Sequence, residues 1–141
     1  MKKILICHVL ALLYSCKPTT ITYYALFDEL PNLYGDIQVT YDSYTIGTAR
    51  GPAQLKSKGL YVMPLQLDRR CYAMMRSNSF LIATNGTLEL RICPQMEAIN
   101  LPPESGIKSF KNEWAFQIFL LNWNGAQWMQ SFQERLPSIP N

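Results

Sequence analysis

Few side chains in this sequence could do acid–base or nucleophilic chemistry. The one histidine of the 141 residues is His8, which lies in an apolar N-terminal stretch. Without another imidazole, the rest of the chain cannot form a Ser-His-Asp or Cys-His site, and most zinc sites are excluded as well. Asp28 and Glu29 are adjacent, so on a strand they would point to opposite faces and would not form a catalytic pair. We expect these two acids to solvate the end of a strand. No phosphate-binding glycine loop or calcium-loop pattern occurs. We therefore expect no enzyme, no cofactor and no metal.

The N-terminus has the pattern of an export signal. Lys2 and Lys3 precede an apolar run from Ile4 to Tyr14, which is shorter than the roughly 20 residues of a membrane span. Leu13-Tyr14-Ser15-Cys16 then resembles the lipobox of bacterial lipoproteins, with a large aliphatic residue three before the cysteine and a small one directly before it. We expect residues 1–15 to be a cleaved signal peptide and Cys16 to carry a lipid anchor. The alternatives are an ordinary secretion signal and a buried first strand.

Cleavage of that signal would leave a nearly neutral chain. Removing Lys2 and Lys3 from the 13 basic residues leaves 11, against 10 acidic ones, a net charge of +1. A nucleic acid is therefore a poor partner for this protein. The local basic cluster is Arg69-Arg70 with Arg76, and its simplest interpretation is a solvated loop.

Cys71 and Cys93 would remain as thiols in the mature chain. In an exported protein two leftover thiols suggest a possible disulfide. The other interpretation is that both are unpaired small core residues. The sequence leaves this open, because a disulfide requires the two Cα atoms to lie within about 7 Å of each other.

Short apolar runs separated by turn residues predict a mainly β protein. Residues 37–42 alternate with period two, a tight turn is expected at Asp42-Ser43, and Asn85-Gly86 predicts a two-residue hairpin turn. Pro64 indicates an edge position or a bulge, and residues 54–59 are expected to form a polar loop. The expected strands are 21–27, 37–41, one starting at 44, 60–67, 79–83, 88–92 and 107–110. This pattern favours a small β-barrel or sandwich, and a barrel also removes unpaired sheet edges.

The C-terminal part, residues 111–141, differs in character from the strands. Residues 113–121 are dense in apolar and aromatic side chains. Residues 126–136 predict an amphipathic helix, because Trp128, Met129 and Phe132 share one face. Such a face requires a partner, which could be its own barrel, a neighbouring subunit or a lipid surface.

Over residues 21 to about 107 the chain resembles the mammalian cell entry (MCE) domain of bacterial lipid-transport systems. The resemblance rests on residues that recur in the family's order and spacing. Phe27 closes the first strand, Leu33 and Gly35 match a Gly-Leu-x-x-Gly-type turn, Val39 lies in the next strand, and Gly47 ends a Val-Gly-like step. Weaker matches follow at 65–68, 76–82 and 101–107.

The resemblance implies a seven-stranded β-barrel that assembles into homo- or hetero-hexameric rings. It also implies that the ring carries phospholipid or other hydrophobic cargo together with a membrane permease and an ATPase. The expected organisation is a signal peptide (1–15), a tether (16–20), the MCE-like barrel (21–110) and an aromatic, helical tail (111–141). A lipid anchor would hold the domain at a membrane facing the periplasm, with the choice between inner and outer membrane left open.

The chain departs from the family at the loop that lines the family's pore. Thr84-Asn85-Gly86-Thr87 is short and polar where the family carries apolar residues. The tail aromatics are therefore the better candidates for a lipid or partner surface: Trp114, Phe116, Phe119, Trp123, Trp128 and Phe132. We expect a lipid-anchored transport subunit. The alternative is an adaptor lipoprotein that docks a partner complex and transports nothing.

Overall fold

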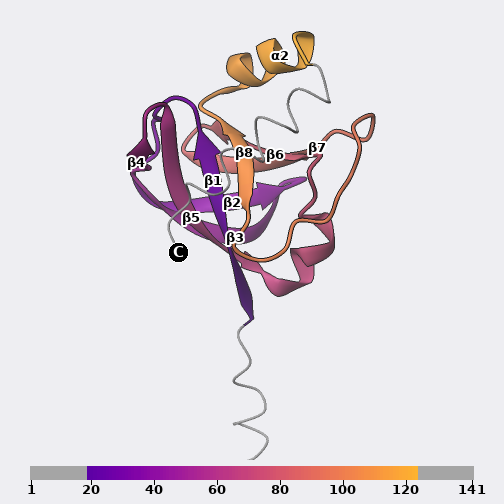
Figure 1. Ribbon diagram of the computed structural model, residues 1–141. Helices are drawn as coiled ribbons and strands as arrows, with labels where there is room; N and C mark the ends of the chain where they lie inside the picture. The colour runs from indigo at the N-terminus through magenta and orange to yellow at the C-terminus, as the bar shows by residue number, and fades with distance from the viewer. Residues whose placement is uncertain (1–18, 124–141) are drawn as a thin grey trace, which may run out of the picture.

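The computed structural model describes residues 19–123, which form a closed β-barrel with a helix over one end (Figure 1). The strands are β1 (Thr20–Phe27), β2 (Gly35–Tyr41), β3 (Tyr44–Gly51), β4 (Gln54–Ser57), β5 (Leu60–Asp68), β6 (Ser79–Thr84), β7 (Thr87–Ile92) and β8 (Gly106–Phe110). A 3-10 helix, η1 (Arg69–Met74), follows β5, and the α-helix α2 (Glu113–Leu121) follows β8.

Seven of these strands close the barrel. Their order is β1-β8-β6-β7-β2-β3-β5, and β5 returns to β1. The closing pair is antiparallel over the whole of β1, from Thr20 opposite Asp68 to Phe27 opposite Tyr61. On its other side β1 pairs in parallel with β8. The predicted mainly β fold, a seven-stranded barrel with a C-terminal helical segment, is therefore confirmed.

The barrel interior is filled by side chains that alternate along the strands. Tyr23, Val39 and Leu65 are each fully buried and belong to one continuous apolar core. The hydroxyl of Tyr23 donates to the carbonyl oxygen of Leu101 at 3.1 Å, which satisfies its one polar group. Burial raises the pKa of Tyr23 to about 12. The barrel core is thus packed around a neutral tyrosine.

Two hairpins form at the predicted tight turns. Asp42 and Ser43 have φ of 48° and 70°, and Asn85 and Gly86 have φ of 49° and 81°. Positive φ at both central residues gives the turn twist that suits neighbouring antiparallel strands. Thr84 pairs directly with Thr87 around the second turn. No room is left there for the apolar loop that the MCE family carries.

The residues that carry the family resemblance have structural roles. Phe27, Leu33 and Val39 are buried in the barrel core. Gly35 begins β2 with φ of 69°, a conformation that glycine adopts without steric cost. At Gly47, a Cβ atom would lie 2.4 Å from the carbonyl oxygen of Gln66. The absence of a side chain at Gly47 therefore lets β3 approach β5 closely.

The prediction of a polar loop at residues 54–59 is wrong. Gln54 to Ser57 form β4, whose Leu55 pairs with Tyr61 of β5. All four residues of β4 are exposed, so the strand has no apolar alternation that a sequence pattern could reveal. Pro64 lies where the partner of β5 changes, since β3 pairs with residues 65–67 and β4 with residues 60–62. The expected irregularity at Pro64 is thus a gap between two partner strands.

Helix α2 begins at a capped N-terminus. The side chain of Asn112 accepts a hydrogen bond from the backbone N–H of Ala115 at 2.8 Å, and Glu113 occupies the first turn. The helix predicted at residues 126–136, with Trp128 and Phe132, and the expected anchor Cys16 lie outside the described residues. Within residues 19–123, no helix is both long enough and apolar enough to span a membrane.

Candidate functional site

An aromatic cluster fixes α2 to the end of the barrel. Phe80 and Phe110 come from β6 and β8, and Phe116 and Phe119 come from the inner face of α2. The Phe110 ring centroid lies 5.2 Å from that of Phe116 and 5.0 Å from that of Phe119, and all these ring pairs are tilted. Tilted aromatic pairs at such distances add to the free energy gained by burial alone. The cluster also encloses Cys93, so α2 covers a second, smaller core.

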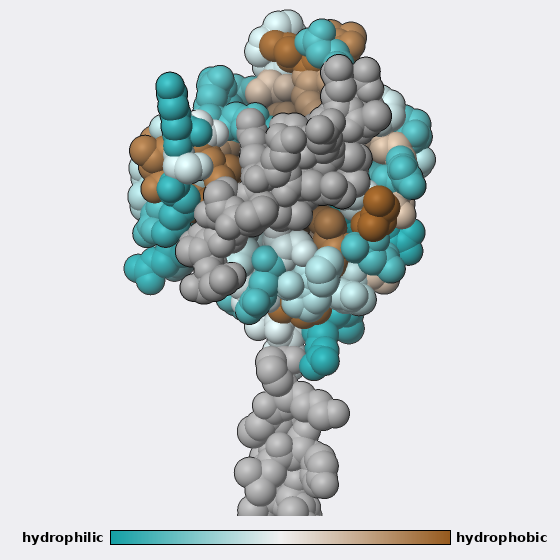
Figure 2. Space-filling model, viewed as in Figure 1, coloured by the Kyte–Doolittle hydropathy of each residue, from teal (hydrophilic) through white to brown (hydrophobic). Residues whose placement is uncertain are grey.

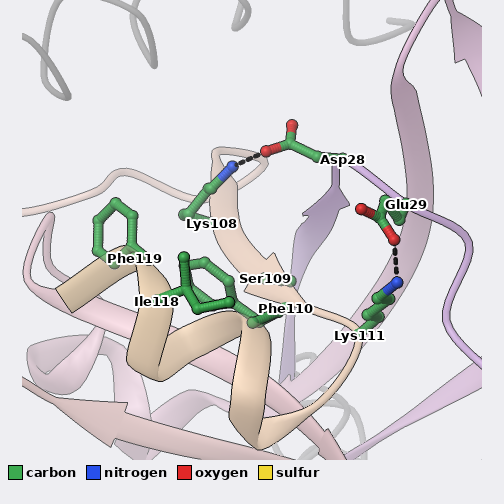
Figure 3. Close-up of a pocket in the computed structure, with 9 residues that line it drawn as sticks. Asp28, Glu29, Lys108, Ser109, Phe110, Lys111, Ile118 and Phe119 are labelled. Atoms are coloured by element: carbon green, nitrogen blue, oxygen red, sulfur yellow. Dashed lines mark hydrogen bonds and ion pairs between the residues drawn. The ribbon is translucent and has the colours of Figure 1, made fainter. Parts of the chain in front are cut away.

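A cleft of about 290 Å³ opens beside this cluster, between α2 and the ends of β1 and β8 (Figure 3). Its apolar wall is formed by Phe110, Ala115, Ile118 and Phe119. Its other lining residues are Asp28, Glu29, Lys108, Ser109 and Lys111. We call this feature the α2 cleft. Its size is close to the lower bound of small-molecule pockets, which are also mostly apolar with a few polar groups.

The rim of the α2 cleft carries two ion pairs. The Lys108 ammonium lies 2.5 Å from a carboxylate oxygen of Asp28, and Lys111 pairs with Glu29. Both acids follow β1, and both lysines lie at the end of β8. Because β1 and β8 are parallel neighbours, their C-terminal ends bring the four charges together.

Lys108 belongs to both parts of the cleft. Its side chain is only 11% exposed, and its ammonium lies 5.6 Å from the centroid of the Phe110 ring. A lysine held over an aromatic face gains a cation–π attraction in addition to its carboxylate partner. The α2 cleft therefore places charged groups beside an aromatic wall. This arrangement suits an amphiphile, with its apolar part on the rings and its polar group at the rim.

The outer face of α2 is also apolar. Trp114, Ile118 and Leu121 recur at helical spacing and are 72%, 41% and 84% exposed. Figure 2 shows hydrophobic residues gathered at the top of the molecule, over the position of α2 in Figure 1. Contiguous apolar side chains on a surface mark contact with another protein or with lipid. The described part of α2 thus has one apolar face on the barrel and another facing outwards.

The aromatic residues that were predicted to form one surface lie in different environments in the structure. Phe116 is 2% exposed, so its expected surface position is wrong: it points inwards and packs on Phe80 and Phe110. Phe119 lines the α2 cleft, and Trp123 is half-buried against the same cluster. Trp114 lies on the outer face. Trp128 and Phe132 lie outside the described residues, so their role stays a prediction.

Sequence reasoning did not identify the charged rim. Asp28 and Glu29 were expected merely to solvate the end of a strand, and the lysines of β8 were not considered. Their parallel strands are distant in the sequence, since Lys108 lies 80 positions after Asp28. The sequence does contain a signal for these ion pairs: two adjacent acids follow one strand, and two lysines flank Phe110 at the end of another.

The two cysteines are both buried and both free. Cys71 belongs to the barrel core and Cys93 to the cluster under α2. The possible disulfide is therefore not formed, and the alternative of two unpaired core residues is the one found. Burial raises the pKa of each thiol, which keeps both in the neutral form. Among residues 19–123 no group of three or more histidine, cysteine or acidic side chains could hold a metal ion.

No protein-family model matches the chain, and no curated protein matches it. Among solved structures it is similar to a chain of the Acinetobacter MlaFEDB complex in the ATP-bound Vtrans1 conformation. The two chains are 14% identical, the match covers 92% of this chain and 94% of that one, and the TM-score is 0.49.

Proposed function

We propose that this chain is a lipid-anchored subunit of an MCE-type lipid-transport system that binds hydrophobic cargo and passes it on without covalent chemistry. Two findings support the proposal. The closed seven-stranded barrel is the fold that the motif resemblance implies, and the family's turn residues occupy positions where that fold requires them. The α2 cleft, with its aromatic wall and charged rim, is the observation that carries the binding function.

The physical basis of such a function is the shielding of acyl chains from water. Each methylene group moved out of water contributes about 0.8 kcal/mol to the free energy of binding, so even a partial apolar wall stabilises a bound lipid tail. Ile118 belongs both to the wall of the α2 cleft and to the exposed outer face of α2. A cargo molecule could thus be shared between the cleft and a neighbouring subunit. In this proposal the partners are other MCE subunits in a ring, a permease and an ATPase.

The proposed anchor is Cys16, acylated after cleavage of residues 1–15. It would place the barrel in the periplasm at the surface of a membrane. Thr20 begins β1, so the tether between the anchor and the barrel would be very short. The lipobox-like residues before Cys16 are the support for this part of the proposal.

The cargo test compares lipid that co-purifies with the full chain and with two matched variants. Ile118→Gln places an amide in the wall of the α2 cleft, whereas Leu55→Gln makes the same kind of change on exposed β4. Native mass spectrometry and lipid extraction should show bound lipid in the wild type and in Leu55→Gln, and a several-fold loss in Ile118→Gln. A wild-type protein without lipid, or equal loss in both variants, would contradict the proposal.

The outer face of α2 supports a second candidate, an adaptor lipoprotein that docks a partner without carrying lipid. Trp114 and Leu121 are the most exposed of its apolar side chains. Replacing both with Ser separates the two functions by size-exclusion chromatography and lipid analysis. Loss of assembly with no lipid bound at any stage favours the adaptor. Loss of bound lipid with assembly intact favours transport.

A further inference from the structure

The barrel end at which β1 begins carries an exposed basic surface. The backbone N–H of Arg69 donates to the carbonyl oxygen of Thr19 at 2.8 Å, which fixes η1 beside the first described residues. Arg69, Arg70 and Arg76 are all exposed. Tyr72 is 44% exposed and lines a shallow recess together with Arg69 and Thr20. We call this region, residues 68–76 with the start of β1, the tether end.

Basic groups outnumber acidic ones at the tether end. Asp68 accepts hydrogen bonds from the guanidinium of Arg70, at 2.8 Å from its Nη2, and caps η1 by accepting from the Arg70 backbone. Arg76 donates from Nε to the carbonyl oxygen of Ala73 at 3.1 Å. Glu104 lines the same recess as Arg69. Residues 68–76 thus carry three guanidinium groups and one carboxylate, with Glu104 in the same recess as Arg69, and the Arg70 side chain in the ion pair is still 90% exposed.

The α2 cleft lies at the opposite end of the barrel. Strand β1 runs from Thr20 at the tether end to Phe27, and Asp28 at the rim of the cleft follows directly. Eight residues of extended chain cover about 26 Å. Figure 1 shows the same separation, with α2 at one end of the barrel and the start of β1 at the other.

We propose that the tether end contacts the anionic headgroups of the membrane that holds the acylated Cys16, an inference that rests on the anchor in the proposed function. Two residues separate Cys16 from Thr19, so the Cα atoms of Cys16 and Thr19 lie at most about 11 Å apart, three fully extended Cα-to-Cα steps. The Arg69 backbone is hydrogen-bonded to Thr19, so an anchor at Cys16 would place the arginines within a short distance of the lipid surface. Arginines near an anionic leaflet are attracted to it, and a tyrosine suits the headgroup region. The contact orients the barrel with the α2 cleft away from the anchoring membrane.

The test uses the full chain, expressed with its N-terminal signal in a bacterial host, in vesicles of phosphatidylcholine alone and of equal parts phosphatidylcholine and phosphatidylglycerol. Amide hydrogen exchange of η1 should slow at least several-fold on the anionic vesicles, and high salt should abolish the difference. Exchange of the hairpin at residues 57–59, at the cleft end, should not change. Equal exchange of η1 on both vesicles would overturn the orientation.

Matched variants distinguish an effect of this particular surface from an effect of the net charge of the protein. Changing Arg69, Arg70 and Arg76 to Gln should abolish the slowing of η1, and changing the same three to Lys should preserve it. Changing Arg50, Lys56 and Lys58 to Gln removes the same charge elsewhere and should have no effect. An equal effect of this control set would overturn the proposal.

Flotation of the same samples distinguishes failure of the lipid anchor from failure of the proposed orientation. A chain that floats with the vesicles but shows unchanged exchange in η1 has the anchor and lacks the orientation. A chain that stays out of the floating fraction with both vesicles contradicts the anchor, and the orientation fails with it.

Discussion

Arg91 of β7 joins the barrel to α2 through Glu113. The guanidinium Nη1 of Arg91 lies 2.5 Å from a carboxylate oxygen of Glu113 in the first turn of the helix, and Nε lies 3.2 Å from Glu89 on its own strand. The same guanidinium stands 5.6 Å from the centroid of the Phe116 ring. Arg91 thus connects the polar start of α2 with the aromatic cluster beneath it.

This ion pair predicts a pH dependence of stability. The hydrogen bond from Arg91 holds the pKa of Glu113 below its ordinary value of 4.5. A carboxyl with a lowered folded pKa contributes stability above its unfolded pKa, and that contribution is lost as the pH falls through the folded pKa. Because the pair is partly exposed, the contribution at neutral pH is about 0.5 kcal/mol. The wild type should therefore exceed Glu113→Gln in free energy of unfolding at neutral pH, and the difference should vanish in acid.

Urea unfolding at a series of pH values measures this difference, and Asp68→Asn is its control. Arg70 lowers the pKa of Asp68 to about 2, mainly through the hydrogen bonds that it donates to the carboxylate, so the wild-type advantage over Asp68→Asn should be lost as the pH falls towards 2. A Glu113→Gln difference that does not change below pH 4.5 would show that the carboxyl makes no such bond.

A Gly47→Ala variant should be destabilised by backbone collision. The added Cβ would lie 2.4 Å from the Gln66 oxygen and 2.9 Å from the Leu67 Cα, and both belong to backbone that cannot rotate away. We expect a loss of about 2 kcal/mol in the free energy of unfolding. Gly59→Ala meets no atom within 4 Å but keeps a φ of 71°, so it should cost about 1 kcal/mol from strain alone. Urea titration should rank the two; a smaller loss for Gly47→Ala contradicts the close approach.

Phe116→Ala should detach α2, whereas Trp114→Ala should not. Phe116 is buried among Phe80 and Phe110, so its truncation leaves a cavity and should cost about 3 kcal/mol. Trp114 is 72% exposed, and its removal should change the free energy of unfolding by less than about 0.5 kcal/mol. Thermal unfolding followed by circular dichroism distinguishes the two. Equal losses would mean that the helix packs through its other face.

The free cysteines predict a specific labelling pattern. Both thiols are buried, and burial raises the pKa of each, so the folded protein should resist alkylation at Cys71 and Cys93. In urea without a reductant both should be alkylated, as peptide mass spectrometry would show. If these residues react only after a reductant is added, a disulfide is present and the described arrangement is wrong.

The barrel was predictable from sequence where local chemistry determines the backbone. Alternation at Ile37 and Val39 and the turns at Asp42-Ser43 and Asn85-Gly86 depend on near neighbours, and these features formed as expected. Strand β4 was missed because its residues are all exposed and its position is set by pairing with β5. An edge strand without buried side chains leaves no periodic signal.

The α2 cleft was not predictable, because it depends on which strands become neighbours. Lys108 and Asp28 meet through a parallel pairing of β1 with β8, and no local pattern specifies that pairing. Likewise, the aromatic residues of α2 were recognised as a group, but nothing in their spacing showed that Phe116 would point inwards while Trp114 would point outwards. The division depends on where the barrel end meets the helix.

The parallel pairing of β1 with β8 also determines how the molecule responds to force. Tyr24 lies opposite Gly106 and Phe27 opposite Ser109, so the two terminal strands of the barrel run in the same direction. A pull that holds the chain before β1 and draws on α2 acts along these strands in opposite senses. The interstrand hydrogen bonds are then loaded together in shear, and do not open one after another. A domain tethered before β1 and attached to a partner through α2 would resist mechanical extension along that line.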